Sequence, residues 1–177
     1  RPLERALQAA IAVLVAVGVA SANLNVVVNG VVALAVTLLP AVAERDLGVR
    51  LGTSMTAVLA LAVFLHVVGM AGLYDAVGWW DHLTHTLSAG VVATSGYATV
   101  RAVDEHSDAV SFPPRFAVAF VFLVTMALGV LWEVLEFAGR AVALAFGQGP
   151  VLVQYGLADT MLDLVFDGVG AVVAAVV

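Results

Sequence analysis

The sequence predicts an all-α, polytopic membrane helix bundle of about six transmembrane helices, with both termini in the cytoplasm. Three observations predict this fold. The 177 residues are 63% hydrophobic and 11% charged, and their mean hydropathy is +1.08, which would leave a water-soluble fold too little polar surface. Apolar segments near the ~20 residues that a helix needs to cross a bilayer recur along the chain. The arginines, finally, fall on alternate connecting loops.

Short polar turns separate the first three apolar segments. The first segment lacks a small-residue cleavage site, so we expect it to remain as a helix and not to be removed as a signal peptide. Asn23 and Asn25 mark the turn that follows it. The second segment ends near Pro40, before a charged loop at residues 44–46, and the third is interrupted only by His66. We therefore expect helices over residues 6–22, 26–42 and 54–73.

The last three apolar segments carry most of the ionisable residues. The fourth begins at Asp81, and a charged loop at residues 101–115 separates it from the fifth. At ~1.5 Å per residue the fifth segment is longer than a ~30 Å hydrocarbon core, so we expect it to project or to break near Gly139. A turn with Gly147 and Pro150 precedes the sixth segment. The expected helices are 81–103, 116–146 and 158–177, and all six belong to one membrane domain, 1–177.

Arginine placement predicts the orientation. Lysine and arginine are enriched on cytoplasmic loops, and the seven basic residues of this chain are all arginines. Arg140 alone falls toward the opposite face. The other six lie at the amino terminus and on the second and fourth loops, which share one side, so we expect both termini of this multi-pass plasma-membrane protein to be cytoplasmic. These six are Arg1, Arg5, Arg45, Arg50, Arg101 and Arg115.

Composition also excludes several classes of function. The chain has no cysteine, which excludes disulfides, thiolate nucleophiles, iron–sulfur clusters and cysteine-based zinc sites. Its net charge of -6 and the lack of a basic patch argue against a nucleic-acid partner. Any metal must therefore be bound by histidine, carboxylate or water.

The predicted orientation brings acidic and histidine residues of three helices to one depth near the extracytoplasmic face. Spacings of three and four residues place each helix's set on one helical face, and ionisable groups at membrane depth normally face the bundle interior. So many carboxylates cannot all stay ionised in a poor dielectric without cations. The set comprises Asp81, His82, His85, Glu133, Glu136, Asp159, Asp163 and Asp167.

A bound divalent metal would supply the missing positive charge, and acid and histidine pairs on facing helices build metal sites in helical bundles. Oxygen ligands with a few imidazoles suit zinc, manganese, iron or magnesium. Protonation of several acids is the alternative, and a proton or cation pathway would use it. Asp81 would orient an imidazole, and Asp167 would do the same or act as a general base. The expected ligands are His82, His85, Glu133, Glu136, Asp159 and Asp163, with His66, Arg140 and Tyr74 as accessory residues.

Each of these residues also has a purely structural interpretation. Asp81 can cap a helix whose histidines bond to neighbouring backbone or lipid headgroups, and a capping role is the more typical one for Asp159. Glu136 and Arg140 are spaced as an ion pair within one helix. His66 alone is more often an interhelical hydrogen-bonding residue than a ligand.

Several motifs occur in a fixed order: His66-Val67-Val68-Gly69, Trp80-Asp81-His82-Leu83-Thr84-His85, Trp132-Glu133-Val134-Leu135-Glu136, and Asp159 to Gly170. Together they resemble the YjdF-like integral membrane proteins and, more distantly, the VanZ-like proteins. The resemblance covers residues 54–177 and implies a compact multi-span membrane protein with acidic and histidine motifs. It transfers no settled activity, although VanZ-like proteins are associated with glycopeptide-antibiotic tolerance and cell-envelope processes.

Three functions are compatible with these observations. The first is a metal-dependent hydrolase or transferase that acts on a membrane lipid or lipid-linked substrate at the outer leaflet. The second is a non-catalytic membrane subunit or scaffold that packs against a membrane-protein partner or a second copy and keeps a structural polar or metal site. The third is an ion or proton carrier. Whether the protein is an enzyme stays open at this stage.

Overall fold

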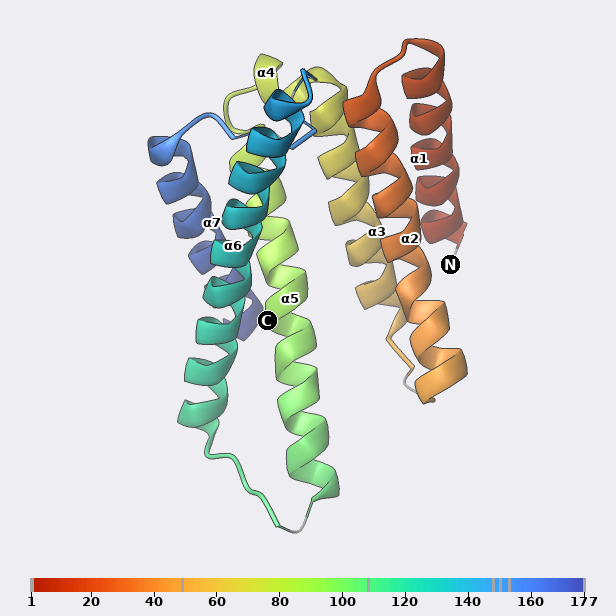
Figure 1. Cartoon of the computed structure of the whole chain (residues 1–177). Coiled ribbons are helices and arrows are strands. Elements are labelled where there is room, and N and C mark those ends of the chain that lie inside the picture. The colour runs from red at the N-terminus through yellow and green to blue at the C-terminus, as the bar shows by residue number, and fades with distance from the viewer. Residues whose placement is uncertain are drawn as a thin grey trace. The chain divides into compact units, whose positions relative to one another are not determined.

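The computed structural model describes residues 2–48, 50–107, 109–147, 149, 151–152 and 154–176. Regular structure within these residues is entirely helical, which confirms the all-α prediction (Figure 1). Six helices are long: α1 (Pro2–Ala20), α2 (Leu24–Leu47), α3 (Thr53–Val68), α5 (Trp80–His106), α6 (Pro114–Ala145) and α7 (Leu157–Val176). A π-helical turn, η1 (Gly69–Leu73), and one short turn of helix, α4 (Tyr74–Ala76), connect α3 to α5.

Among the described residues, four helical segments are long and apolar enough to cross a membrane. These segments are Pro2–Ala20, Leu24–Asp46, Thr53–Ala76 and Pro114–Ala145. The other two long helices are more polar. Helix α5 is rich in serine, threonine and histidine, and α7 carries three aspartates in its first half. Helices α5 and α7 thus carry His85, Asp163 and Asp167 of the candidate site, and the candidate span α6 carries Glu133.

Two expected helix ends differ from the structure. Helix α2 passes through Pro40 and ends at Leu47, where the N–H of Gly48, at a φ of 67°, donates to Ala43 O. Proline is tolerated inside membrane helices because neighbouring groups satisfy the backbone that it frees. Helix α6 continues through Gly139 without a break. Arg1, Pro150 and Val177, which the sequence analysis used, lie outside the described residues.

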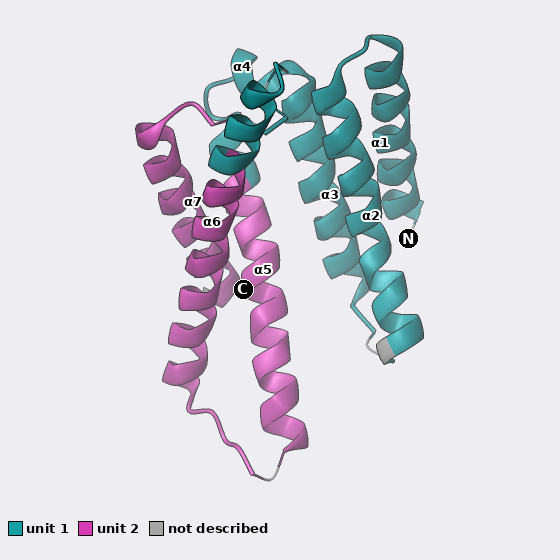
Figure 2. Cartoon of the chain, viewed as in Figure 1, with its two compact units in different colours: residues 1–84, 137–153 teal, residues 85–136, 154–177 magenta. Residues whose placement is uncertain are grey.

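The chain divides into two compact units, which are described separately (Figure 2). Unit 1 comprises residues 1–84 and 137–153. Its helices α1, α2 and α3 lie side by side, and small and β-branched side chains form their buried core. That core consists of Ile11, Val26, Ala33 and Val67.

Unit 2 comprises residues 85–136 and 154–177 and contains most of α5, most of α6 and all of α7. Helices α5 and α7 cross closely in this unit. A Cβ at Gly170 of α7 would lie 2.2 Å from Thr86 O on α5, and the Thr86 hydroxyl donates to Phe166 O at 3.4 Å. This crossing holds the early turns of α5 against the middle of α7. The apolar core beyond it consists of Ala93, Val100, Ala117, Val121 and Ala171.

Candidate metal centre

The imidazole of His85 is the centre of the polar cluster in unit 2. His85 lies in the second turn of α5 and is only 8% exposed. Its Nδ1 is 3.1 Å from Asp167 Oδ1 on α7, and its Nε2 is 4.0 Å from Glu133 Oε1 on α6. If Nδ1 carries the proton and donates it to Asp167, Nε2 presents its lone pair toward Glu133. Histidines that bind metals are usually oriented in this way, by a carboxylate on the other nitrogen.

Glu133 is buried, with 4% of its surface exposed. Its polar surroundings are Thr160, Asp159 and Asp167 of α7 and His85 of α5. Although the Thr160 side chain is close, neither carboxylate oxygen accepts a hydrogen bond of good geometry from the described residues. A buried carboxylate without such bonds is costly unless it binds a cation or takes up a proton. Glu133 therefore indicates that a positive charge belongs here.

Asp167 adds a second buried oxygen of this kind. Its Oδ1 faces His85, whereas its Oδ2 is buried and has no hydrogen-bond partner among the residues that the structure describes. Gly129 of α6 makes room for this oxygen, because a Cβ at Gly129 would lie 2.2 Å from it. The carboxylate of Asp167 thus packs directly against the backbone of α6.

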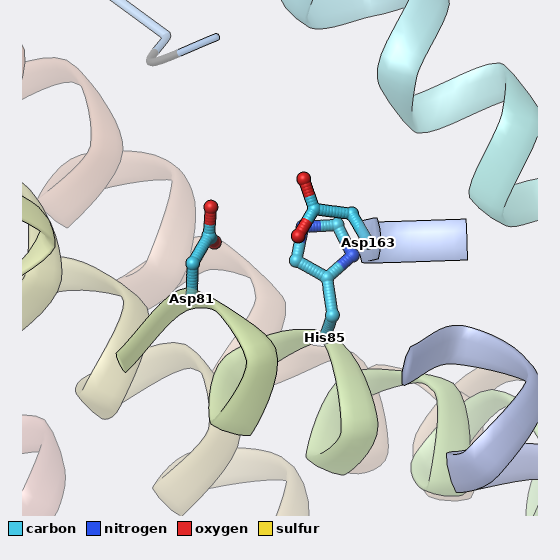
Figure 3. A group of neighbouring side chains, drawn as sticks. All are labelled: Asp81, His85 and Asp163. Carbon is cyan, nitrogen blue, oxygen red and sulfur yellow. The ribbon is translucent and has the colours of Figure 1, made fainter. Parts of the chain in front are cut away.

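Asp163, one turn before Asp167 on α7, is 1% exposed and among the most deeply buried side chains of the described chain. Asp163, His85 and Asp81 each offer a ligand atom, and the three atoms lie within 4.8 Å of one another. Asp81 is one turn before His85 on the same unbroken helix, α5. Figure 3 shows the aspartate of α7 beside the imidazole and Asp81 preceding it on its helix. Such a group of one imidazole and two carboxylates can bind zinc, manganese, iron or magnesium.

Comparison with known proteins identifies the family. Residues 3–177 match the family described as "Predicted membrane protein (DUF2238)". The chain belongs to this family. A protein from Thermotoga maritima, described as "Uncharacterized protein", is 33% identical over 114 residues, which are 63% of this chain and 55% of the relative. The chain thus spans about half the length of that relative. No solved structure matches the chain.

The other expected ligands of this DUF2238 protein occupy different surroundings. Glu136 is buried and accepts a hydrogen bond from Trp132 Nε1 at 3.0 Å. Asp159 accepts the backbone N–H of Tyr155 at 3.0 Å, the capping role that its position favoured. His82 is half-buried and is not a member of the metal-competent group found among the described residues. Their roles as ligands stay predictions.

The three accessory residues belong to unit 1 of the DUF2238 protein, and two of them, His66 and Tyr74, contact each other. His66 Nδ1 lies 2.8 Å from Tyr74 Oη, and His66 Nε2 lies 3.2 Å from Asn29 Oδ1. These contacts agree with the interhelical hydrogen-bonding interpretation of His66. Arg140, the third accessory residue, is exposed on α6, one turn after Glu136.

The sequence analysis did not anticipate two residues that shape the site, Gly129 and Thr84. Gly129 precedes Glu133 by four residues, so the two share a helical face, and that spacing is a signal from which its role can be predicted. Thr84 lies between two histidines in sequence and is 3% exposed. Its bond to Asp81, three residues earlier, is of the kind that helical threonines commonly make, whereas its contact with Tyr74 depends on tertiary structure.

Proposed function

We propose that this DUF2238 protein binds one divalent cation at His85 and Asp163 of unit 2, with Asp81, one turn before His85 on α5, as a third ligand and Glu133 beside His85. The supporting observation is the set of buried carboxylates around one imidazole. Glu133, Asp163 and Asp167 are each 4% exposed or less, and the basic side chain that contacts two of them is His85, at 3.1 Å from Asp167 and 4.0 Å from Glu133. A divalent ion offsets these charges, whereas three buried carboxylates without one would repel strongly.

The same proposal extends to chemistry on a lipid or lipid-linked substrate. When bound, the ion would polarise a phosphoryl or carbonyl oxygen and activate a water molecule. Asp167 would hold the imidazole in its metal-binding orientation, or would accept a proton as general base. VanZ-like proteins, which the motifs distantly resemble, are associated with cell-envelope processes, and this agrees with a lipid substrate.

Turnover of a defined lipid tests this proposal. We expect purified protein to release phosphate from dioleoyl phosphatidic acid or farnesyl pyrophosphate in detergent micelles, when supplied in turn with zinc, manganese, iron or magnesium. Chelation should abolish the release. Asp167→Asn should lower it by about 100-fold or more, because a positioned proton acceptor typically contributes 10²–10⁴-fold. Glu105→Gln, at an exposed position of α5, is the control.

A different outcome would distinguish the second function. If the protein binds metal at one ion per chain but turns over neither lipid, the ion stabilises a membrane subunit and the enzymatic proposal fails. If Asp167→Asn carries ions across vesicles more slowly than the wild type does, the third function, a carrier, replaces both.

We also propose that six helices cross the plasma membrane and that both termini are cytoplasmic, because the arginines alternate between loops. The absence of cysteine makes a direct test possible. In intact cells, a membrane-impermeant maleimide should label Ser21→Cys, in the first loop. It should label Ser107→Cys, in the fourth loop, only after lysis. Labelling of Ser107→Cys in intact cells would contradict this orientation.

A further inference from the structure

A chain of hydrogen-bonding side chains in unit 1 ends at Asp81. It begins at Asn29 of α2, passes through His66 of α3 and Tyr74 of α4, and reaches Thr84 of α5. Asn29 and Thr84 are buried, with 6% and 3% of their surface exposed. Burying a polar side chain costs free energy unless it forms hydrogen bonds. A chain whose members are all hydrogen-bonded holds those side chains in one geometry.

The direction of the chain is set at Asn29. The amide nitrogen of Asn29 donates to Asn25 O at 2.9 Å and to Val151 O at 2.7 Å, so its oxygen must face His66. His66 Nε2 then carries a proton and donates it to that oxygen at 3.2 Å. In the neutral ring, Nδ1 accepts the hydroxyl proton of Tyr74 across 2.8 Å. The imidazole and the phenol also contact edge to face, with ring centroids 5.8 Å apart.

Tyr74 reaches this position because of the irregular backbone between α3 and α5. The π-helical turn η1 contains Gly72 at a φ of 131°, a conformation that side chains with a Cβ rarely adopt. π-Helical turns inside helices occur frequently at functional sites. The start of α5 is anchored to the same helix, since Trp80 Nε1 donates to Leu65 O at 3.1 Å. Both ends of this connection are therefore held against α3.

Thr84 connects the chain to Asp81. Its hydroxyl lies 3.2 Å from Tyr74 Oη, 2.8 Å from Asp81 O and 3.5 Å from Asp81 Oδ1. Because Tyr74 gives its proton to His66, the one hydroxyl proton of Thr84 is shared between Tyr74 Oη and Asp81 as acceptors. The Thr84 hydroxyl thus contacts both the backbone and the carboxylate of Asp81. Thr84 is also the sequence neighbour of His85, a second proposed ligand.

We propose that Tyr74, Thr84 and His66 are positioning residues that hold Asp81 in its metal-binding geometry. This inference rests on the proposed metal centre. Thr84 is the member of the chain that contacts Asp81, through the backbone oxygen and the carboxylate of that residue. The hydrogen-bonded chain of unit 1 thus supports the first turn of α5.

Cobalt binding tests this inference, because Co²⁺ reports ligand geometry through its visible absorption. Loss of a group that supports a ligand typically lowers metal affinity by about 10–100-fold. We expect a loss of this size for Tyr74→Phe and for Thr84→Val, which remove one hydroxyl each, together with a changed cobalt spectrum. Thr84→Ser keeps the hydroxyl and should restore both affinity and spectrum. Tyr97→Phe, at an exposed position of α5, should bind like the wild type.

The outcomes separate the two proposals. A wild-type protein that binds no cobalt overturns the metal centre itself. A wild type that binds cobalt, with Tyr74→Phe and Thr84→Val binding it equally well and with the same spectrum, overturns only the positioning role. Thermal unfolding of each variant is measured alongside. If Thr84→Val does not fold, the comparison of Tyr74→Phe with Tyr97→Phe decides, since each loses only a phenolic hydroxyl.

Discussion

His85→Ala is expected to lower the divalent-metal affinity of the purified protein by more than about 100-fold, beyond the 10–100-fold that loss of a supporting group costs. His85 supplies the only imidazole of the group that it forms with Asp81 and Asp163 among the described residues. With alanine at position 85, only carboxylates would remain as ligands. It would also leave Asp167 Oδ1 without the nitrogen that faces it at 3.1 Å, which should cost about 1–3 kcal/mol of stability.

Equilibrium dialysis with metal analysis by mass spectrometry measures the affinity, and thermal unfolding in detergent measures the stability. His82→Ala is the matched control, because it removes the same residue type three positions earlier on the same helix. We expect His82→Ala to change the metal affinity and the thermal stability only slightly. Equal losses in both variants would favour the ligand set expected from sequence, with His82 included, and a His85→Ala protein with wild-type affinity would refute the proposed centre.

Gly129→Ala is expected to destabilise unit 2 and weaken metal binding, although this glycine is not a ligand. Glycine to alanine inside a helix normally stabilises it by about 0.5–1 kcal/mol. Here the added Cβ would lie 2.2 Å from Asp167 Oδ2 and 3.1 Å from Asp167 Cγ, so the carboxylate must move. Overpacking of this kind costs about 1–3 kcal/mol, and the steric term should win. A displaced Asp167 would release His85, with a loss of about 10–100-fold in metal affinity.

Gly96→Ala provides the comparison for this substitution. Gly96 lies within α5, and a Cβ there would be 3.8 Å from the Val121 side chain, an ordinary van der Waals distance. It should gain the usual helix stabilisation and keep wild-type metal affinity. A Gly129→Ala protein that behaves like Gly96→Ala in both respects would show that Asp167 does not depend on this close approach.

The long helices were predictable because their signal is hydrophobic length, which depends on composition alone. Their ends were harder to predict. Pro40 indicates a helix end by local rules, but α2 continues to Leu47, since surroundings in a bundle can satisfy the backbone that proline frees. Gly139 did not break α6 either. For this segment the expectation was that it projects or breaks, and the structure shows one unbroken helix of 32 residues.

The candidate site was predictable to the level of which helices contribute to it. Asp163 and Asp167 are i,i+4 neighbours, and both are buried on one face of α7, as their spacing indicates. Spacing within one helix does not show which acid of α7 meets His85, because that depends on how α5 and α7 cross. Asp159 sits one turn earlier on that face, yet its carboxylate caps the helix.

The central claim is that an ion is bound by His85 and Asp163, and anomalous diffraction from crystals grown with zinc or manganese tests it most directly. The account predicts one anomalous peak about 2.0–2.2 Å from an imidazole nitrogen of His85 and from a carboxylate oxygen of Asp163, the range typical of zinc ligands, with Asp81 or Glu133 completing the ligand set. No peak at this position in crystals soaked at saturating metal, or a His85 side chain that points to lipid, would contradict it.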